Sequence, residues 1–208
     1  MSTPLDLRVI VITDRKLAAP RTVEWVVHEA LAAGAPAVQL RDKRASSAEL
    51  LLQAAALLEL TARHDARLFI NDRLDVALAS GAQGVHLGPE DLPIAAARRA
   101  APALLLGFST DSPEQAQLAQ RSGADYIGCG AVFGTTSKAE AADQQIGPEG
   151  VQRVTRAVHL PVVAIGGITP DNVQQLTHTG AAGCAVLSAV MTAQRPGEVV
   201  QRLLRAFR

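Results

Sequence analysis

Aromatic residues are scarce in this chain, where Phe, Trp and Tyr together make up 3% of 208 residues. So few rings argue against a platform that stacks nucleic-acid bases. An excess of either charge is also missing, because 20 Lys and Arg balance 20 Asp and Glu. A neutral chain has no broad attraction for nucleic acid or an anionic membrane. We therefore expect neither of these as a partner.

Long hydrophobic runs and paired cysteines are missing too. The first apolar run, at 8–13, is too short for the core of a signal peptide or for a membrane span. A cytoplasmic location is therefore expected. Cys129 and Cys184 are the only cysteines, they form no CxxC pair, and each stands in an apolar stretch. We expect both to be buried thiols.

Short apolar runs recur along the whole chain. With 48% hydrophobic residues, residues 1–208 suffice for one domain around one core. The runs predict strands at 8–13, 36–40, 67–71, 84–87, 104–109, 124–130, 161–166 and 183–188. Several are apolar at successive positions, which is typical of strands covered on both faces, as in parallel sheets.

Helical patterns separate these strands, and we predict helices at 22–34, 46–64, 112–123 and 169–180. The alternation predicts an α/β fold, a minimal (β/α)8 TIM barrel. A doubly wound open sheet is the alternative. It would usually have fewer strands and a GxGxxG phosphate loop after the first one, where this chain has "ITDRK".

Polar residues stand at the carboxyl ends of the predicted strands. In a parallel barrel all these ends open on one face, where active sites are built. The residues are Thr13, Asp14, Gln39, Arg41, Lys43, Asn71, Asp72, Gly88, Asp91, Ser109, Thr135, Ser137, Lys138, Gly166, Gly167 and Ser188. Together they predict one polar mouth.

Two carboxylates, Asp72 and Asp91, follow neighbouring strands of the predicted barrel. Each could cap the helix after it. Adjacent strands lie only about 5 Å apart, however, so the two charges would be unfavourable without a cation. Mg²⁺ is often held by one or two carboxylates plus substrate phosphates, and Asn71 could bind a phosphate oxygen beside it. No HExxH spacing occurs, and we interpret His86 as a structural histidine.

The stretch "QLRDK" places Arg41 and Lys43 on one side of an extended segment, because side chains alternate there. A guanidinium offers a fork to phosphate oxygens and an ammonium a point charge. The pair could bind a phosphate, or it could be a solvated pair at the rim.

A long irregular segment, 130–147, carries Thr135, Ser137 and Lys138. Long loops in compact domains are often lids, so these residues could clamp a phosphate. A surface loop without a role is the alternative. A second anion site is predicted after the last two strands, where Gly166 and Gly167 permit close approach and Ser188 begins a helix.

The ordered set of motifs resembles the thiamine-phosphate synthase family across nearly the whole chain. The motifs are "VQLRDK", "FINDRLDVALASGAQGVHLGPEDLP", "GFST", "ADYIGCGAVFGTTSK", "VVAIGGIT" and "AVLSAV". The resemblance implies a transferase that joins a hydroxymethylpyrimidine diphosphate to a thiazole phosphate, through a pyrimidine-stabilised carbocation. The products would be thiamine phosphate and diphosphate.

The resemblance also implies residue roles. Mg²⁺ would be held by Asp72 and Asp91, and the catalytic residues would be Arg41, Lys43 and Lys138. The expected substrate contacts are Gln39, Arg41, Lys43, Asn71, Ser109, Thr135, Ser137, Lys138, Gly166, Gly167, Leu187 and Ser188. The partners of the protein would be these small-molecule substrates. The protein itself would be a monomer or a small homo-oligomer.

The chain departs from the family pattern in the loop "GAVFGTTSK", where Ala131 and Gly134 replace stiffer residues. Two other functions stay open. A related thiazole tautomerase tends to lack the paired aspartates and to carry a histidine at the position of Ala131. A sensor of phosphate ligands would not need a metal beside a diphosphate clamp.

Overall fold

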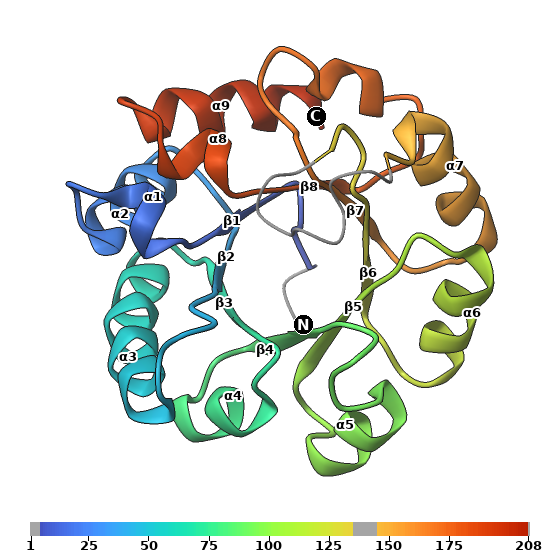
Figure 1. Ribbon diagram of the computed structural model, residues 1–208, viewed down its shortest axis with the longest axis horizontal. Coiled ribbons are helices and arrows are strands. Elements are labelled where there is room, and N and C mark those ends of the chain that lie inside the picture. The colour runs from blue at the N-terminus through green and yellow to red at the C-terminus, as the bar shows by residue number, and fades with distance from the viewer. Residues whose placement is uncertain (1–4, 135–144, 208) are drawn as a thin grey trace.

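Eight parallel strands form a closed barrel in the computed structural model, which describes residues 5–134 and 145–207 (Figure 1). Their bounds are β1 Val9–Ile12, β2 Ala37–Leu40, β3 Arg67–Asn71, β4 Gly84–Leu87, β5 Leu105–Ser109, β6 Tyr126–Cys129, β7 Val162–Ile165 and β8 Gly183–Val186. Each strand pairs with the next in sequence, and β8 pairs with β1. The (β/α)8 barrel predicted from the sequence is confirmed.

A ring of helices surrounds the barrel (Figure 1). Their bounds are α1 Arg15–Ala18, α2 Val23–Ala32, α3 Ser47–Arg63, α4 Leu74–Ser80, α5 Ile94–Ala100, α6 Pro113–Arg121, α7 Gly147–Ala157, α8 Ser188–Met191 and α9 Pro196–Ala206. In the described part of the chain, none of these helices is long and apolar enough to cross a membrane. The sequence ranges had not included α7 and α9, although each begins with a proline in its first turn, a common start signal.

Local start signals explain two of the predicted helices. Ser46 accepts a hydrogen bond from Glu49 N–H, and the Glu49 carboxylate accepts one from Ser46 N–H, so α3 opens with a capping box. Ser112 caps α6 by accepting from Gln115 N–H, and Pro113 is its first residue. Both helices therefore start at the positions that the sequence indicated.

The prediction of a helix at 169–180 is wrong. This stretch forms only a 3-10 turn, η2, at Val173–Leu176. The Asn172 carboxamide accepts from Thr169 N–H and donates to the Gly167 carbonyl, while Thr169 Oγ1 accepts from Asp171 N–H. Side chains that bond to nearby backbone groups compete with the helical pattern, and here they prevail.

The core has two parts, one between barrel and helices and one inside the barrel. The inner part is built from Leu7, Ile10, Ile12, Ala37, Phe69, Tyr126, Val163 and Ala185. Both cysteines are buried, as predicted, and burial raises the pKa of each thiol to about 12. The thiols therefore stay protonated and have no nucleophilic role at neutral pH.

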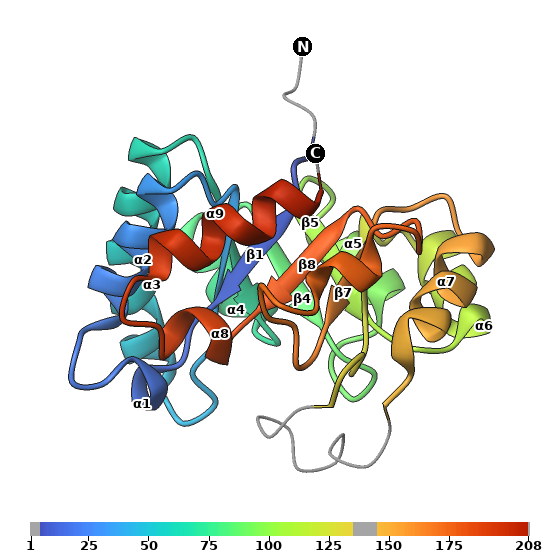
Figure 2. The same ribbon diagram turned by 90° about the horizontal axis from the view of Figure 1, so that it is seen from above.

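The carboxyl ends of the strands all lie at one end of the barrel. In Figure 2 the short helices α1 and α8, which follow β1 and β8, lie on the side opposite to the N-terminal entry of the chain. Among the described residues, this end carries the polar side chains that the sequence singled out.

Candidate active site

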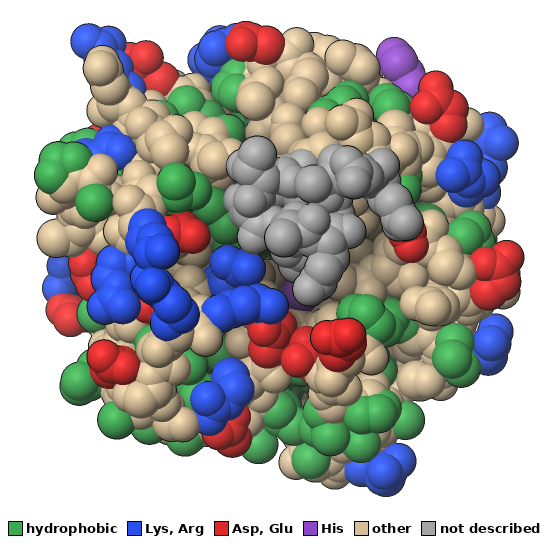
Figure 3. Space-filling view, viewed as in Figure 1, with side chains coloured by type: hydrophobic (Ala, Val, Ile, Leu, Met, Phe, Trp, Pro, Cys, Tyr) green, Lys and Arg blue, Asp and Glu red, His purple; other side chains and the backbone are tan. Residues whose placement is uncertain are grey.

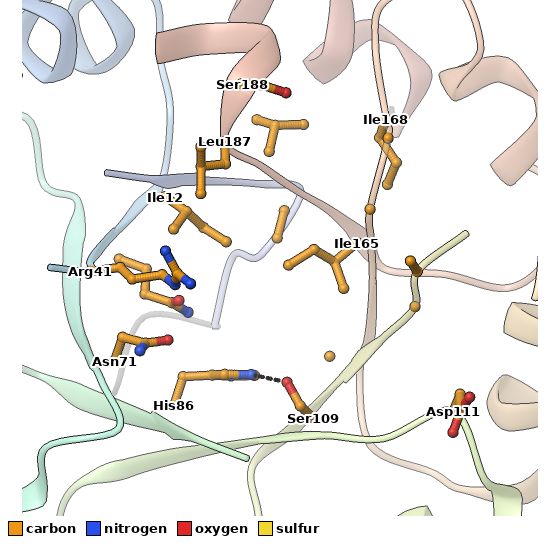
Figure 4. A pocket seen from close by; sticks show the side chains of 18 of the residues that line it. Ile12, Arg41, Asn71, His86, Ser109, Asp111, Ile165, Ile168, Leu187 and Ser188 are labelled. Carbon is orange, nitrogen blue, oxygen red and sulfur yellow. Dashed lines mark hydrogen bonds between the residues drawn. The ribbon is translucent and has the colours of Figure 1, made fainter. Parts of the chain in front are cut away.

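A cavity of about 280 Å³ opens at the carboxyl ends of the strands. Its wall is partly apolar, with Ile12, Ile165, Ile168 and Leu187, and partly polar, with side chains from β2 to β5 (Figure 4). An apolar cavity with a few convergent polar groups is the usual form of a small-molecule site.

Most of the predicted contacts line this cavity. They are Gln39, Arg41, Asn71, Ser109, Gly166, Gly167, Leu187 and Ser188. Three other predicted residues, Thr135, Ser137 and Lys138, lie outside the described residues. Asp14 has a local role instead, because its carboxylate caps α1 by accepting from Lys16 N–H and Leu17 N–H. The predicted contacts that do line the cavity come from the ends of β2, β3, β5, β7 and β8.

The two predicted metal ligands meet at the edge of the cavity. Burial raises the pKa of the Asp72 carboxyl above its ordinary value, and the neighbouring Asp91 carboxylate raises it further. The cationic Lys43 and Arg41 oppose the rise, and Lys43 Nζ lies 3.9 Å from Asp72 Oδ2. A divalent metal ion between the two carboxylates would remove their mutual repulsion. The residues present therefore fit a divalent ion.

Neither carboxylate caps a helix, so the alternative prediction is wrong for both. The residue before α4 is Arg73 and the residue before α5 is Pro93, and neither helix has a side-chain cap. Asp91 Oδ2 instead accepts from Gly88 N–H at 2.7 Å. In the described ranges no three His, Cys, Asp or Glu residues cluster as a metal site. Two carboxylates would leave most positions on Mg²⁺ for substrate oxygens and water.

The basic side of the mouth follows β1 and β2. Arg41 is held by its backbone, whose N–H donates to Thr13 Oγ1 at 3.0 Å. The Arg15 guanidinium lies 3.2 Å from Asp42 Oδ2, so this intervening carboxylate is already paired with a cation. Figure 3 shows Lys and Arg side chains gathered on this side of the mouth and acidic side chains below it. A phosphate group would therefore be attracted to this side.

The glycine pair after β7 has a structural role that the sequence did not reveal. Gly166 has φ +100° and Gly167 has φ +64°, both in the region that favours glycine. A Cβ on Gly166 would lie 2.6 Å from Ala131 Cα, and one on Gly167 would lie 2.6 Å from the Gly134 carbonyl oxygen. The 131–134 segment of the chain therefore packs closely against these two glycines.

A buried hydrogen-bonded group escaped the sequence reasoning. His86 Nδ1 lies 2.9 Å from Tyr126 Oη, and His86 Nε2 lies 2.8 Å from Ser109 Oγ (Figure 4). His86 is thus satisfied, as predicted, but it also lines the cavity. The signal that could have revealed it is the alternation of β4, which gives His86 the same facing as Gly84.

The sequence of this chain matches a known protein family and several known proteins. The family model described as thiamine monophosphate synthase matches residues 9–190. The chain belongs to this family. It is 46% identical over 197 residues to the thiamine-phosphate synthase of Pyrococcus furiosus, covering 95% of this chain and 93% of that protein. It is 41% identical over 208 residues to the enzyme of Ruminiclostridium cellulolyticum, covering 100% and 98%.

A solved structure is similar to this chain along nearly its whole length. The thiamine phosphate pyrophosphorylase of Pyrococcus furiosus superposes with a TM-score of 0.89 at 44% identity, covering 97% of this chain and 96% of that one. The family resemblance and the function seen in the sequence are confirmed. So is the prediction of a transferase of thiamine biosynthesis that acts on small molecules.

Proposed function

We propose that this thiamine-phosphate synthase uses Mg²⁺, held by Asp72 and Asp91, to join a hydroxymethylpyrimidine diphosphate to a thiazole phosphate. The observation that carries the proposal is the pair of carboxylates at the ends of β3 and β4. The Asp91 carboxylate helps to raise the pKa of Asp72, and the cationic Lys43 and Arg41 oppose that rise. Such an arrangement suits a metal diphosphate better than it suits a metal-free protein.

The diphosphate would lie on the basic side of the mouth. Arg41 and Asn71 line the cavity, and Lys43 reaches Asp72 from the rim. The bound metal would neutralise negative charge on the departing diphosphate. Arg41 and Lys43 would share this task by hydrogen bonding to the same oxygens. Lys138 stays a predicted further contact.

The bond changes are simple. The bond between the methylene carbon and the diphosphate oxygen breaks, and its electron pair leaves with the diphosphate. The lone pair of the thiazole nitrogen then forms the new carbon–nitrogen bond. No proton needs to move, which agrees with a cavity in which His86 already bonds Tyr126 and Ser109. The chain's contribution is to hold the two substrates together and to keep water away from the pyrimidine carbocation. The apolar side chains of Ile12 and Ile165 are suited to exclude water.

The thiazole phosphate would lie on the other side of the cavity. Gly166, Gly167, Leu187 and Ser188 line that side and come from the ends of β7 and β8. Loops after the last two strands are a recurrent phosphate site in these barrels. Thr135 and Ser137 stay predicted contacts. Two anion sites on opposite walls would point the two substrates at each other.

The paired carboxylates disfavour the thiazole tautomerase, and so does Ala131, which lines the cavity without an imidazole. A sensor would have no use for a cation beside the diphosphate. We further propose that the enzyme acts in the cytoplasm as a monomer or a small homo-oligomer.

The test mixes both substrates with the protein, with Mg²⁺ or with a chelator, and measures thiamine phosphate. We expect product only with Mg²⁺, and a loss of at least about 100-fold in turnover for Asp91→Asn. Asp75→Asn is the matched control, because Asp75 is an exposed carboxylate on α4 that pairs with Arg73. Full activity with the chelator, or equal losses in the two variants, would exclude the proposed metal site.

A further inference from the structure

One arginine joins two short helices at the mouth of the barrel. The Arg21 guanidinium donates to the Ala193 carbonyl and, at 2.8 Å, to the Met191 carbonyl, both at the C-terminal end of α8. It also donates to the carbonyl of Ala18, the last residue of α1. The two helices follow the paired strands β1 and β8 and lie next to each other (Figures 1 and 2). Arg21 therefore connects segments that are 170 residues apart in the chain.

The Arg21 side chain is itself held in place. It is partly buried, and its guanidinium carbon lies 5.4 Å from the centroid of the Trp25 ring. The Arg21 backbone N–H donates to the Ala18 carbonyl at 3.0 Å, so the backbone and the side chain bind the same oxygen. A planar guanidinium presents its donors in a rigid fork, so several bonds to it fix its orientation as well as its position. The contact is therefore suited to hold α8 in one place.

The helix that Arg21 binds is a single turn, Ser188–Met191. One turn is unfavourable by itself, because too few hydrogen bonds compensate for ordering its backbone. Burial of Val190 and Met191 packs the turn against the rest of the barrel. The carbonyl groups at the end of a helix lack partners within it, and Arg21 supplies donors there. A cation at this end also suits the helix dipole. Arg21 thus adds a polar anchor to an apolar one.

The other end of the same turn lines the cavity, with Leu187 and Ser188. The Ser188 carbonyl accepts from Thr192 N–H at 3.0 Å and from Thr192 Oγ1 at 2.9 Å. The Leu187 carbonyl accepts from Met191 N–H at 2.9 Å. One helical turn, about 6 Å along its axis, separates the carbonyls that Arg21 binds from the residues at the cavity. A shift at the Arg21 end would therefore move Leu187 and Ser188 as well.

We propose that Arg21 is a positioning residue for the thiazole phosphate: by holding the C-terminal end of α8, it sets where Leu187 and Ser188 lie in the cavity. This rests on the proposed function, which places the thiazole phosphate against these two residues. Arg21 does not line the cavity, so it acts through α8. The pyrimidine diphosphate is proposed to lie at the ends of β2 and β3, and its binding should not depend on α8.

The test measures two affinities by calorimetry. An unreactive pyrimidine diphosphate is titrated with Mg²⁺ into the free protein, and thiazole phosphate into the protein saturated with that compound. We expect Arg21→Leu to weaken thiazole phosphate binding at least about 10-fold, because misplacing a group by about 1 Å can have an effect of this size. The affinity for the diphosphate should stay within about 2-fold, since its contacts lie on other strands. The fitted stoichiometry gives the folded fraction, so a less stable variant still reports its affinities.

Arg21→Lys separates position from charge. Lysine keeps the positive charge but lacks the planar fork, so this variant should weaken thiazole phosphate binding at least about 5-fold. Arg98→Lys is its matched control. Arg98 also binds backbone carbonyls, including those of Leu104 and Gly123, but it does so at the amino ends of β5 and β6, away from the cavity. The control should lower stability in urea and leave both affinities unchanged.

The inference is overturned if Arg21→Leu binds thiazole phosphate as the wild type does, if Arg21→Lys keeps full affinity, or if Arg98→Lys shows the same selective loss. Failure of the proposed function is a separate outcome. Normal thiazole phosphate binding by Ser188→Asp would remove the phosphate from α8 and the inference with it. Weak binding by Ser188→Asp together with normal binding by the Arg21 variants would retain the site and reject only the positioning role of Arg21.

Discussion

Asp72 combines several unfavourable features in one residue. It has φ +65° without being glycine, its carboxyl is half-buried, and Asp91 lies beside it. Strained backbone and like charges in close contact both lower the stability of a folded chain. The position at a strand end allowed the sequence to predict its place, but not this strain, which depends on the path of the backbone between β3 and α4.

Asp72→Asn should therefore stabilise the metal-free protein at pH 7, by about 1 kcal/mol, while it removes Mg²⁺-dependent turnover. The amide carries no charge to bury or to repel Asp91, and Asn tolerates the left-handed backbone well. Urea unfolding in a chelator measures the difference.

The pH dependence tests the cause of this effect. Because the pKa of Asp72 is raised in the folded protein, its proton favours folding, and that contribution is lost as the pH rises through the raised pKa. The advantage of Asp72→Asn should thus be larger at pH 7 than near the ordinary Asp pKa of 3.8. An advantage that is the same at both pH values would point to the backbone alone.

At the scale of elements, the turn after β7 shows what a motif can and cannot reveal. "IGG" predicted an anion site at the mouth, which stays a prediction, and the structure shows left-handed φ values at Gly166 and Gly167. The contacts of this turn could not be read from the sequence, since Val132 N–H donates to the Ile165 carbonyl and Phe133 N–H to the Gly166 carbonyl, in each case between residues 33 positions apart in the chain. The His86–Tyr126 bond was missed for the same reason, because both residues come together only through the barrel register.

Gly167→Ala should destabilise the protein more than Gly81→Ala does. Both glycines have left-handed φ values, +64° and +76°, so both variants incur a similar backbone strain of about 1 kcal/mol. A Cβ on Gly81 meets nothing within 4 Å, whereas one on Gly167 meets the Gly134 carbonyl oxygen at 2.6 Å. Urea unfolding of the two variants gives the difference. Equal losses would mean that the 131–134 segment moves aside freely.

Ser188→Asp should separate the two proposed anion sites. Ser188 is an exposed residue that lines the cavity at the start of α8, so a larger side chain has room there. The added charge should weaken binding of thiazole phosphate at least about 10-fold by repulsion, whereas Ser188→Asn should do much less. An unreactive pyrimidine diphosphate should bind nearly as before. Calorimetric titration measures both ligands, and loss of the diphosphate alone would mean that the two sites are assigned backwards.

For the whole molecule, the barrel was predictable because eight apolar runs and the helices between them repeat one local pattern. Net charge was a poorer guide. The formal charge is zero, yet α1 and the segment 41–44 carry Arg15, Lys16, Arg41, Lys43 and Arg44. Figure 3 shows basic side chains on that side of the mouth. The field that a diphosphate meets is therefore set by where the charges lie and not by their sum.

This asymmetry predicts electrostatic steering of the diphosphate substrate. Arg44→Gln should slow association of an unreactive pyrimidine diphosphate several-fold at low salt, because it removes a charge next to Lys43 at the mouth. Arg63→Gln is the control. Arg63 ends α3, whose 17 residues begin at the mouth and span about 25 Å, so its charge lies at the far end of the barrel and beyond a screening length. Stopped-flow binding measures both rates, and the difference should fade near 0.5 M salt, where screening is about 4 Å. A difference that persists at high salt would instead make Arg44 a direct contact of the bound diphosphate.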